Sequence, residues 1–175
     1  ITYSISGSEI NINSSTGVLT FASAPDYETK SSYTATVTAS DGGNSVNQNI
    51  TVNINNLNEF TPSFTSNATF TVDENQTAIG TVTATDGDGD TLTYSISGSE
   101  INIDSSSGVL TFVSAPDFET PGSAASSNAY SLTVTATDAG DNTDSTDVTI
   151  NVIDIIENSG SAAYSIIGSK YVGST

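Results

Sequence analysis

The stretch TYSISGSEINI at Thr2–Ile12 recurs unchanged at Thr93–Ile103, and this exact repeat is the feature that decides the fold. Further matches follow in the same order, namely GVLTF at Gly17–Phe21 and Gly108–Phe112, and SAPDYET at Ser23–Thr29 returning as SAPDFET at Ser114–Thr120. A period of about a hundred residues is too long for a solenoid repeat and fits a small β-sandwich domain. The sequence therefore predicts tandem domains.

Apolar residues alternate with Ser and Thr along several short runs. Tyr130, Leu132 and Val134 are spaced in this way, as are Val148 and Ile150. Period-two alternation is typical of half-buried strands, and turn clusters rich in Asp, Gly and Asn separate the runs. No window favours an amphipathic helix. We expect an all-β fold of tandem Greek-key sandwiches of immunoglobulin-like type, with about seven strands in each.

The two copies differ in completeness. The second copy has Pro62–Asp90 upstream of its shared strand, whereas the first has nothing before Ile1. The first domain should therefore lack roughly two N-terminal strands, and we expect the polypeptide to continue in that direction. The predicted units are the C-terminal part of a repeat at 1–59, a complete repeat at 60–158, and a tail or start of a further unit at 159–175.

Composition excludes several classes of function. The chain has 20 acidic and 2 basic residues, a net charge of −18, and no His, Cys, Met or Trp. Imidazole and thiol catalysis, disulfides and zinc fingers are therefore excluded. A nucleic-acid partner is not expected, because two basic residues cannot neutralise its phosphate backbone. Apolar runs are too short for membrane insertion. We expect a secreted or cell-surface protein, bacterial in origin, that is not an enzyme and coordinates hard cations.

Short carboxylate motifs recur at domain spacing, and in order they resemble the cadherin repeat. They are Val72–Asn75 (VDEN), Asp86–Asp88 (DGD), Asp26–Glu28 (DYE) with Asp117–Glu119 (DFE), Ala39–Asp41 (ASD) with Ala136–Asp138 (ATD), and the segment Asn56–Phe64 (NLNEFTPSF). The resemblance covers the second copy throughout and the first from its middle onward. It implies that each domain has the cadherin-like, immunoglobulin-related sandwich fold.

The resemblance also implies Ca2+ between successive domains, about three ions to a junction. For the internal junction it implies the ligands Asp26, Glu28, Asn58, Glu59, Asp86, Asp88 and Asp138, with the backbone carbonyls of Leu57 and Phe60. For the following junction it implies Glu74, Asp117, Glu119, Asp154 and Glu157, and it assigns Asp41 to a junction before Ile1. Independently, calcium prefers six to eight oxygen ligands, and crowded acids repel one another without cations.

Some residues depart from the family pattern or allow other interpretations. Tyr27 and Phe118 replace the usual Arg, and Ile156 stands at an Asn ligand position. The acidic run Asp86–Asp90 could be a solvated turn or a self-contained calcium loop, although no Glu stands at its twelfth position. Paired carboxylates also occur in glycosidases, but no Trp is present to stack on a sugar.

The sequence leaves three functions open. The first is a calcium-rigidified structural or adhesion module, a spacer in a long surface stalk, adhesin or fibre. The second is a module that binds a surface glycan or another copy of itself. The third is an appendage of a secreted enzyme. The expected partners are calcium ions and neighbouring repeats of the same polypeptide. Few exposed aromatic residues and the absence of Arg weigh against a binding face.

Overall fold

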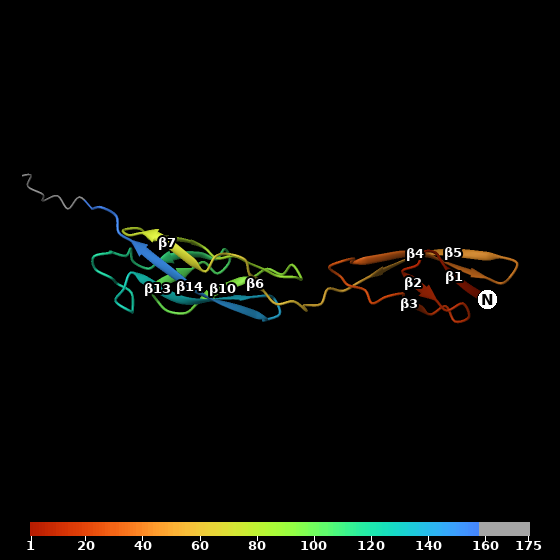
Figure 1. Cartoon of the computed structure of the whole chain (residues 1–175). Coiled ribbons are helices and arrows are strands. Elements are labelled where there is room, and N and C mark those ends of the chain that lie inside the picture. Colours follow the sequence, from red (N-terminus) through yellow and green to blue (C-terminus); the bar gives the residue numbers. More distant parts are fainter. Residues whose placement is uncertain (158–175) are drawn as a thin grey trace, which may run out of the picture.

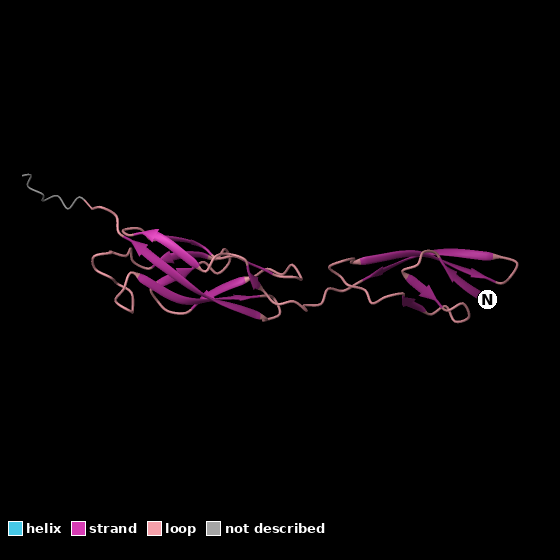
Figure 2. Ribbon diagram, in the orientation of Figure 1, coloured by secondary structure: helices cyan, strands magenta, loops and turns pink. Residues whose placement is uncertain are grey.

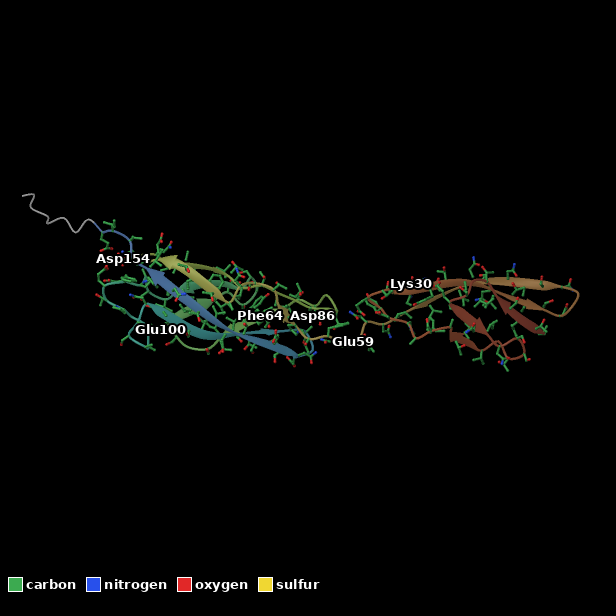
Figure 3. The ribbon with its side chains drawn as sticks, viewed as in Figure 1. Lys30, Glu59, Phe64, Asp86, Glu100 and Asp154 are labelled. Atoms are coloured by element: carbon green, nitrogen blue, oxygen red, sulfur yellow. The ribbon has the colours of Figure 1, made fainter. Side chains whose placement is uncertain are left out.

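The computed structural model describes residues 1–157 and contains strands but no helix within that range, as the alternation predicted. None of the described residues forms a helix that is long and apolar enough to cross a membrane. The strands form two groups that lie end to end (Figures 1 and 2). Residues 54–62, here called the linker, contain no strand and run between the groups, with Glu59 near the gap (Figure 3).

We call the strands β1–β5 the first unit and β6–β14 the second unit. The first unit contains β1 (Thr2–Ile5), β2 (Ile10–Ile12), β3 (Leu19–Phe21), β4 (Ser32–Ser40) and β5 (Ser45–Asn53). The second contains β6 (Ser63–Phe64), β7 (Thr69–Asp73), β8 (Ala78–Thr81), β9 (Ala84–Thr85), β10 (Thr93–Ile96), β11 (Ile101–Ile103), β12 (Val109–Phe112), β13 (Ala129–Thr137) and β14 (Thr143–Ile153).

Two sheets make the sandwich of the second unit. One has the order β10-β13-β14-β7 and the other β11-β12-β8, with a short β6-β9 pair beside them. Strand β7 joins β14 in parallel, whereas the other pairs are antiparallel. The first unit repeats this plan as β1-β4-β5 and β2-β3. Among the described residues the first unit has no counterparts of β7 and β8, which extend the two sheets of the second unit.

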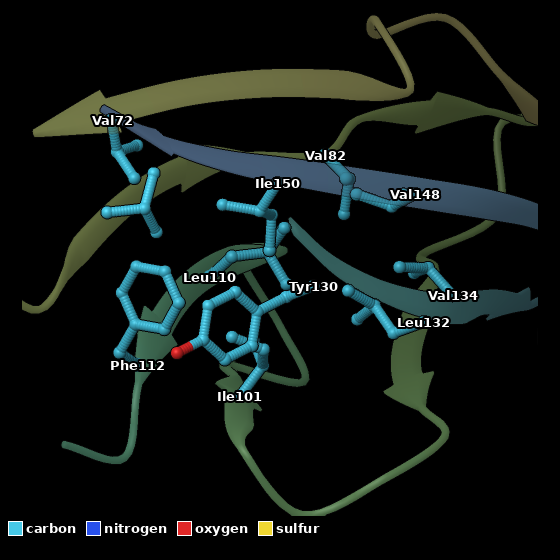
Figure 4. Close-up of a cluster of buried hydrophobic side chains, with 11 residues drawn as sticks. Val72, Val82, Ile101, Leu110, Phe112, Tyr130, Leu132, Val134, Val148 and Ile150 are labelled. Atoms are coloured by element: carbon cyan, nitrogen blue, oxygen red, sulfur yellow. The ribbon is translucent and has the colours of Figure 1, made fainter. Parts of the chain in front are cut away.

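The core of the second unit lies between its two sheets (Figure 4). Alternate residues of β13 and β14 point into it, and Leu110, Val134 and Ile150 are fully buried. Apolar burial of this kind contributes about 25 cal/mol per Å² of surface removed from water. The buried cluster contains Val72, Val82, Ile101, Leu110, Phe112, Tyr130, Leu132, Val134, Val148, Ile150 and Val152.

The first unit buries far less. Ile10 is its only buried hydrophobic residue, and Leu19 is 39% exposed although its equivalent, Leu110, is 0% exposed. Leu110 packs in a buried cluster with Val72 and Val82, and the first unit has no counterparts of these two valines among the described residues. The same residues in the same local structure are therefore buried in one copy and open in the other.

Strand register decides which end of each unit carries which acids. Ser32 pairs with Asn53 in the β4–β5 hairpin, so the loop before β4, with Asp26 and Glu28, lies at the linker end. In the second unit the β13–β14 turn, which begins at Asp138, lies at the opposite end of β14 from Ile153. Acidic loops therefore gather at the ends of the units and leave the strands between them.

Candidate metal centres

The acidic turn at Asp86–Asp88 holds the linker against the second unit. Asp88 Oδ2 accepts hydrogen bonds from the backbone N–H groups of Glu59 at 3.0 Å and Phe60 at 2.8 Å. The Phe60 ring lies so close to Gly87 that a Cβ at this position would clash with the ring. This turn therefore uses a carboxylate to bind the linker backbone and a glycine to admit the linker side chain.

Two carboxylate oxygens of this turn lack a hydrogen-bond partner among the described residues. Asp86 Oδ2 and Asp88 Oδ1 are buried and accept no hydrogen bond from any of residues 1–157. A buried carboxylate oxygen without a partner loses its hydration without compensation, whereas a bound cation would satisfy it. An open hollow of about 260 Å³ between the linker and the second unit includes Asp88 but not Asp86, and it is lined by Asn56, Leu57, Asn58, Asp88, Asp90, Ala139 and Gly140. The carboxylates of Asp88 and Asp90 in this lining are ligands of the kind that a hard cation such as calcium prefers.

Asp138 and Asn58 meet at the same junction through Asn142. Asn142 Nδ2 donates to Asn58 Oδ1 at 2.8 Å and to Asp138 Oδ2 at 2.9 Å, and Asn58 Nδ2 donates to Asp90 Oδ2 at 3.0 Å. Desolvation acts to raise the pKa of Asp138, but hydrogen bonds from Asn142 and Gly140 hold that pKa below its ordinary value. Asp138 therefore stays ionised although its side chain is buried.

Asp90 and Asn142 were not predicted as site residues. The only sequence signal for Asp90 was its place as the third acid of the Asp86–Asp90 run. Asn142 lies beyond the motif that ends at Asp138, and only the turn between β13 and β14 brings its amide back to that carboxylate.

The first unit presents Glu28 to this junction. The backbone N–H of Glu28 favours its ionised form, but desolvation, Asp26 and the charges of Asp88 and Glu59 together raise the pKa of Glu28. Asp26 instead accepts local hydrogen bonds from Thr29 and Glu28, and the Thr29 hydroxyl at 2.8 Å is the main cause of its lowered pKa. No three carboxylates of residues 1–157 converge within 4.8 Å at this junction, so its acids surround a space without closing on it.

Three other predicted ligands do converge, at the far end of the second unit. Glu74, Asp117 and Glu119 each offer an oxygen within 4.8 Å of the others. Glu74 is 2% exposed, and its oxygens accept the backbone N–H groups of Phe118 at 2.8 Å and Ile155 at 3.0 Å. The end of β7, the loop after β12 and the segment after β14 are thereby fixed around one buried carboxylate.

The acids around Glu119 repel its ionised form. The backbone N–H of Glu119 favours its ionised form, but desolvation and the charges of Glu74, Asp154 and Asp117 raise the pKa of Glu119. Asp154 therefore acts on this cluster, whereas Glu157 accepts a hydrogen bond from Asn75 Nδ2. Part of the predicted junction, Asn158, and the whole predicted unit at 159–175 lie outside the described residues.

Asp41 lies apart from both centres. It stands at the β4–β5 turn, at the end of the first unit away from the linker, where Oδ1 accepts from the N–H groups of Asn44 at 2.7 Å and Gly43 at 2.9 Å. These hydrogen bonds, those of Asn44 first, lower the pKa of Asp41. Its expected metal role stays a prediction.

Comparisons with known proteins agree with this geometry. The cadherin domain model matches residues 68–153. Human protocadherin Fat 4 is 38% identical over 169 residues and human protocadherin Fat 1 is 35% identical over 178; the matches cover 87% and 90% of this chain. The crystal structure of mouse cadherin-23 EC22–24 is 26% identical with a TM-score of 0.69, and the match covers 88% of this chain and 53% of that one.

The two human relatives are far longer than this chain, which covers 3% of Fat 4 and 4% of Fat 1. They are animal adhesion proteins rather than enzymes, and they lend no support to a bacterial source. Calcium binding is general among cadherin domains. Residues 68–153 therefore form a cadherin domain, and the chain has the all-β fold of cadherin extracellular repeats.

Proposed function

We propose that this chain is a calcium-stiffened stretch of a longer cell-surface adhesion protein, in which metal at the internal junction fixes the angle between the two units. The ligands would be Asp26, Glu28, Asn58, Glu59, Asp86, Asp88 and Asp138, with the carbonyls of Leu57 and Phe60. Calcium would supply positive charge and six to eight coordination positions where these oxygens gather.

The unpartnered oxygens of Asp86 and Asp88 carry this proposal. Asp88 already binds the linker through its other oxygen, so a cation at its free oxygen would lie against both linker and second unit. Glu28 lies at the linker end of the first unit, and the charge of Asp88 contributes to raising the pKa of Glu28. A metal shared by these groups would make bending of the linker break coordination bonds.

Without calcium, the acids on both sides of the linker repel one another, and we expect a loose hinge. The strands would stay folded, because the core of the second unit contains none of the proposed ligands. Small-angle scattering of the whole chain tests this idea. Calcium should lengthen the molecule and narrow its distance distribution compared with chelator.

The variant Asp88→Asn with Glu28→Gln should abolish that response. The Asn carbonyl can still accept the two linker N–H groups, so the change removes the charge and the free oxygen while it keeps the linker attached. Asp147→Asn is the matched control, since Asp147 lies in the middle of β14 and bonds Thr133. Identical scattering with calcium and with chelator would overturn the stiffening mechanism. Isothermal titration would then show separately whether calcium binds.

Glu74, Asp117, Glu119, Asp154 and Glu157 would form a second calcium centre. The convergence of Glu74, Asp117 and Glu119, the first of them a buried carboxylate, supports this assignment. A following repeat of the same polypeptide would complete the coordination and extend the stiffened rod. In this role the protein's partners are calcium ions and its own neighbouring repeats, and adhesion to other copies would be a property of the longer protein.

A further inference from the structure

The two units differ at the position that Lys30 occupies in the first unit. In the first unit Lys30 Nζ lies 2.6 Å from both carboxylate oxygens of Glu9 and 4.6 Å from the centroid of the Tyr33 ring. Tyr33 in turn packs edge-on against Phe21, with 5.1 Å between ring centroids. A carboxylate and an aromatic face together hold one ammonium group.

The second unit repeats this frame without the lysine. Glu100 and Tyr130 are the equivalents of Glu9 and Tyr33, and Tyr130 packs edge-on against Phe112 at 5.0 Å between centroids. The segment Pro121–Ala129 replaces Lys30–Ser32 of the first copy, so no lysine follows the shared threonine. Lys30 is the only lysine or arginine within residues 1–157, and it is paired with Glu9.

A groove lies where the ammonium would be. Its volume is about 370 Å³, and it is lined by Ser99, Glu100, Phe112, Val113, Ser114, Ala115, Pro116, Asp117, Thr120, Gly122 and Tyr130. Glu100 is half-buried and forms no ion pair within the described residues, whereas Tyr130 is 7% exposed. Desolvation and then the charge of Glu100 raise the pKa of Tyr130, which shows that this carboxylate acts on that ring.

We infer that this groove binds the lysine side chain of a partner polypeptide, with its ammonium between Glu100 and the Tyr130 ring. Lysine is the occupant because the protein's own copy of the frame holds lysine. The net charge of −18 adds a long-range attraction for a basic partner. This site would recognise a partner and does not require bound metal. The groove and the second proposed calcium centre share one residue, Asp117.

The test uses the whole chain in saturating calcium, so that metal already occupies any centre that includes Asp117. Nα-acetyl-lysine methylamide is titrated while the ring protons of Tyr130 and Phe112 are followed by NMR. We expect saturable shifts at millimolar probe, and Glu100→Gln should weaken binding by about tenfold or more. Glu9→Gln removes the same charge from the first unit and should leave the titration unchanged.

Two further measurements make the result decisive. Replacing residues 121–129 with Lys-Ser-Ser from the first copy should fill the groove from within the chain and abolish binding of the probe. The norleucine analogue, which has the stem without the ammonium, should give no saturable shift. Equal shifts with norleucine would overturn the inference, and so would undiminished binding in the Glu100→Gln variant. Shifts that do not saturate up to a probe concentration of about 100 mM would also overturn it.

Discussion

Replacing Glu74 with Gln should separate the structural role of this buried side chain from its proposed role as a metal ligand. Both of its oxygens accept backbone N–H groups, from Phe118 and Ile155, and the side chain is 2% exposed. In Glu74→Gln the carbonyl oxygen retains one of these hydrogen bonds. The new amide group faces the other N–H, so two donors meet without an acceptor.

The expected cost follows from these two bonds. A hydrogen bond to a charged group contributes about 1.5–3 kcal/mol, so Glu74→Gln should lose about that much stability in chelator. For a domain of this size the loss corresponds to a fall in Tm of about 6–24 °C. At a calcium concentration about 100 times Kd the metal adds about 2.7 kcal/mol to the wild type. If Glu74 is a ligand, calcium should therefore widen the gap between the two proteins.

Thermal unfolding of the whole chain, with calcium and with chelator, measures both parts. The matched control is Glu119→Gln, because Glu119 is exposed and its pKa is raised by neighbouring acids. It should cost no stability in chelator and should reduce only the gain from calcium. Equal Tm values for Glu74→Gln and wild type in chelator would refute the structural reasoning. A gap that calcium leaves unchanged would refute the role of Glu74 as a ligand.

Three further predictions concern burial, linker packing and pH. Leu110→Ala should destabilise the second unit by about 2–5 kcal/mol, whereas Leu19→Ala should cost the first unit far less because that side chain is partly exposed; residue-resolved hydrogen exchange compares them. Gly87→Ala should displace the linker phenylalanine ring and broaden the distance distribution measured by scattering in calcium. Hydrogen bonds lower the pKa of Asp104 in the folded protein, and the bond from the Ser106 hydroxyl is the largest cause. The stability that they contribute should therefore be complete above about pH 4 and should be lost as the pH falls below that value. Asp104→Asn should remove this part of the acid dependence of Tm.

The sequence alone predicts the fold class, and it predicts most of the acidic residues that lie at the ends of the two units. Period-two alternation predicts strands because side chains on a strand point alternately to its two faces, and β13 and β14 lie where it predicted them. The repeated TYSISGSEINI stretch predicts two copies of one unit, because the same residues prefer the same local structure. The unequal lengths of the repeats predict a first copy without its N-terminal strands, and this division into units stays a prediction.

Only the tertiary structure decided which of these residues are buried and which acids meet. Leu19 and Leu110 have the same local sequence, yet their exposure differs because Leu110 packs in a buried cluster with Val72 and Val82, which have no described counterparts in the first unit. Glu74, Asp117 and Glu119 converge, and Asn142 reaches Asp138, because distant loops end at the same edge of the sandwich. Local sequence sets the strand and the turn, but burial and charge depend on what packs against them from elsewhere in the chain. For the same reason the sequence does not predict the groove beside Tyr130, which depends on how distant segments pack around that ring.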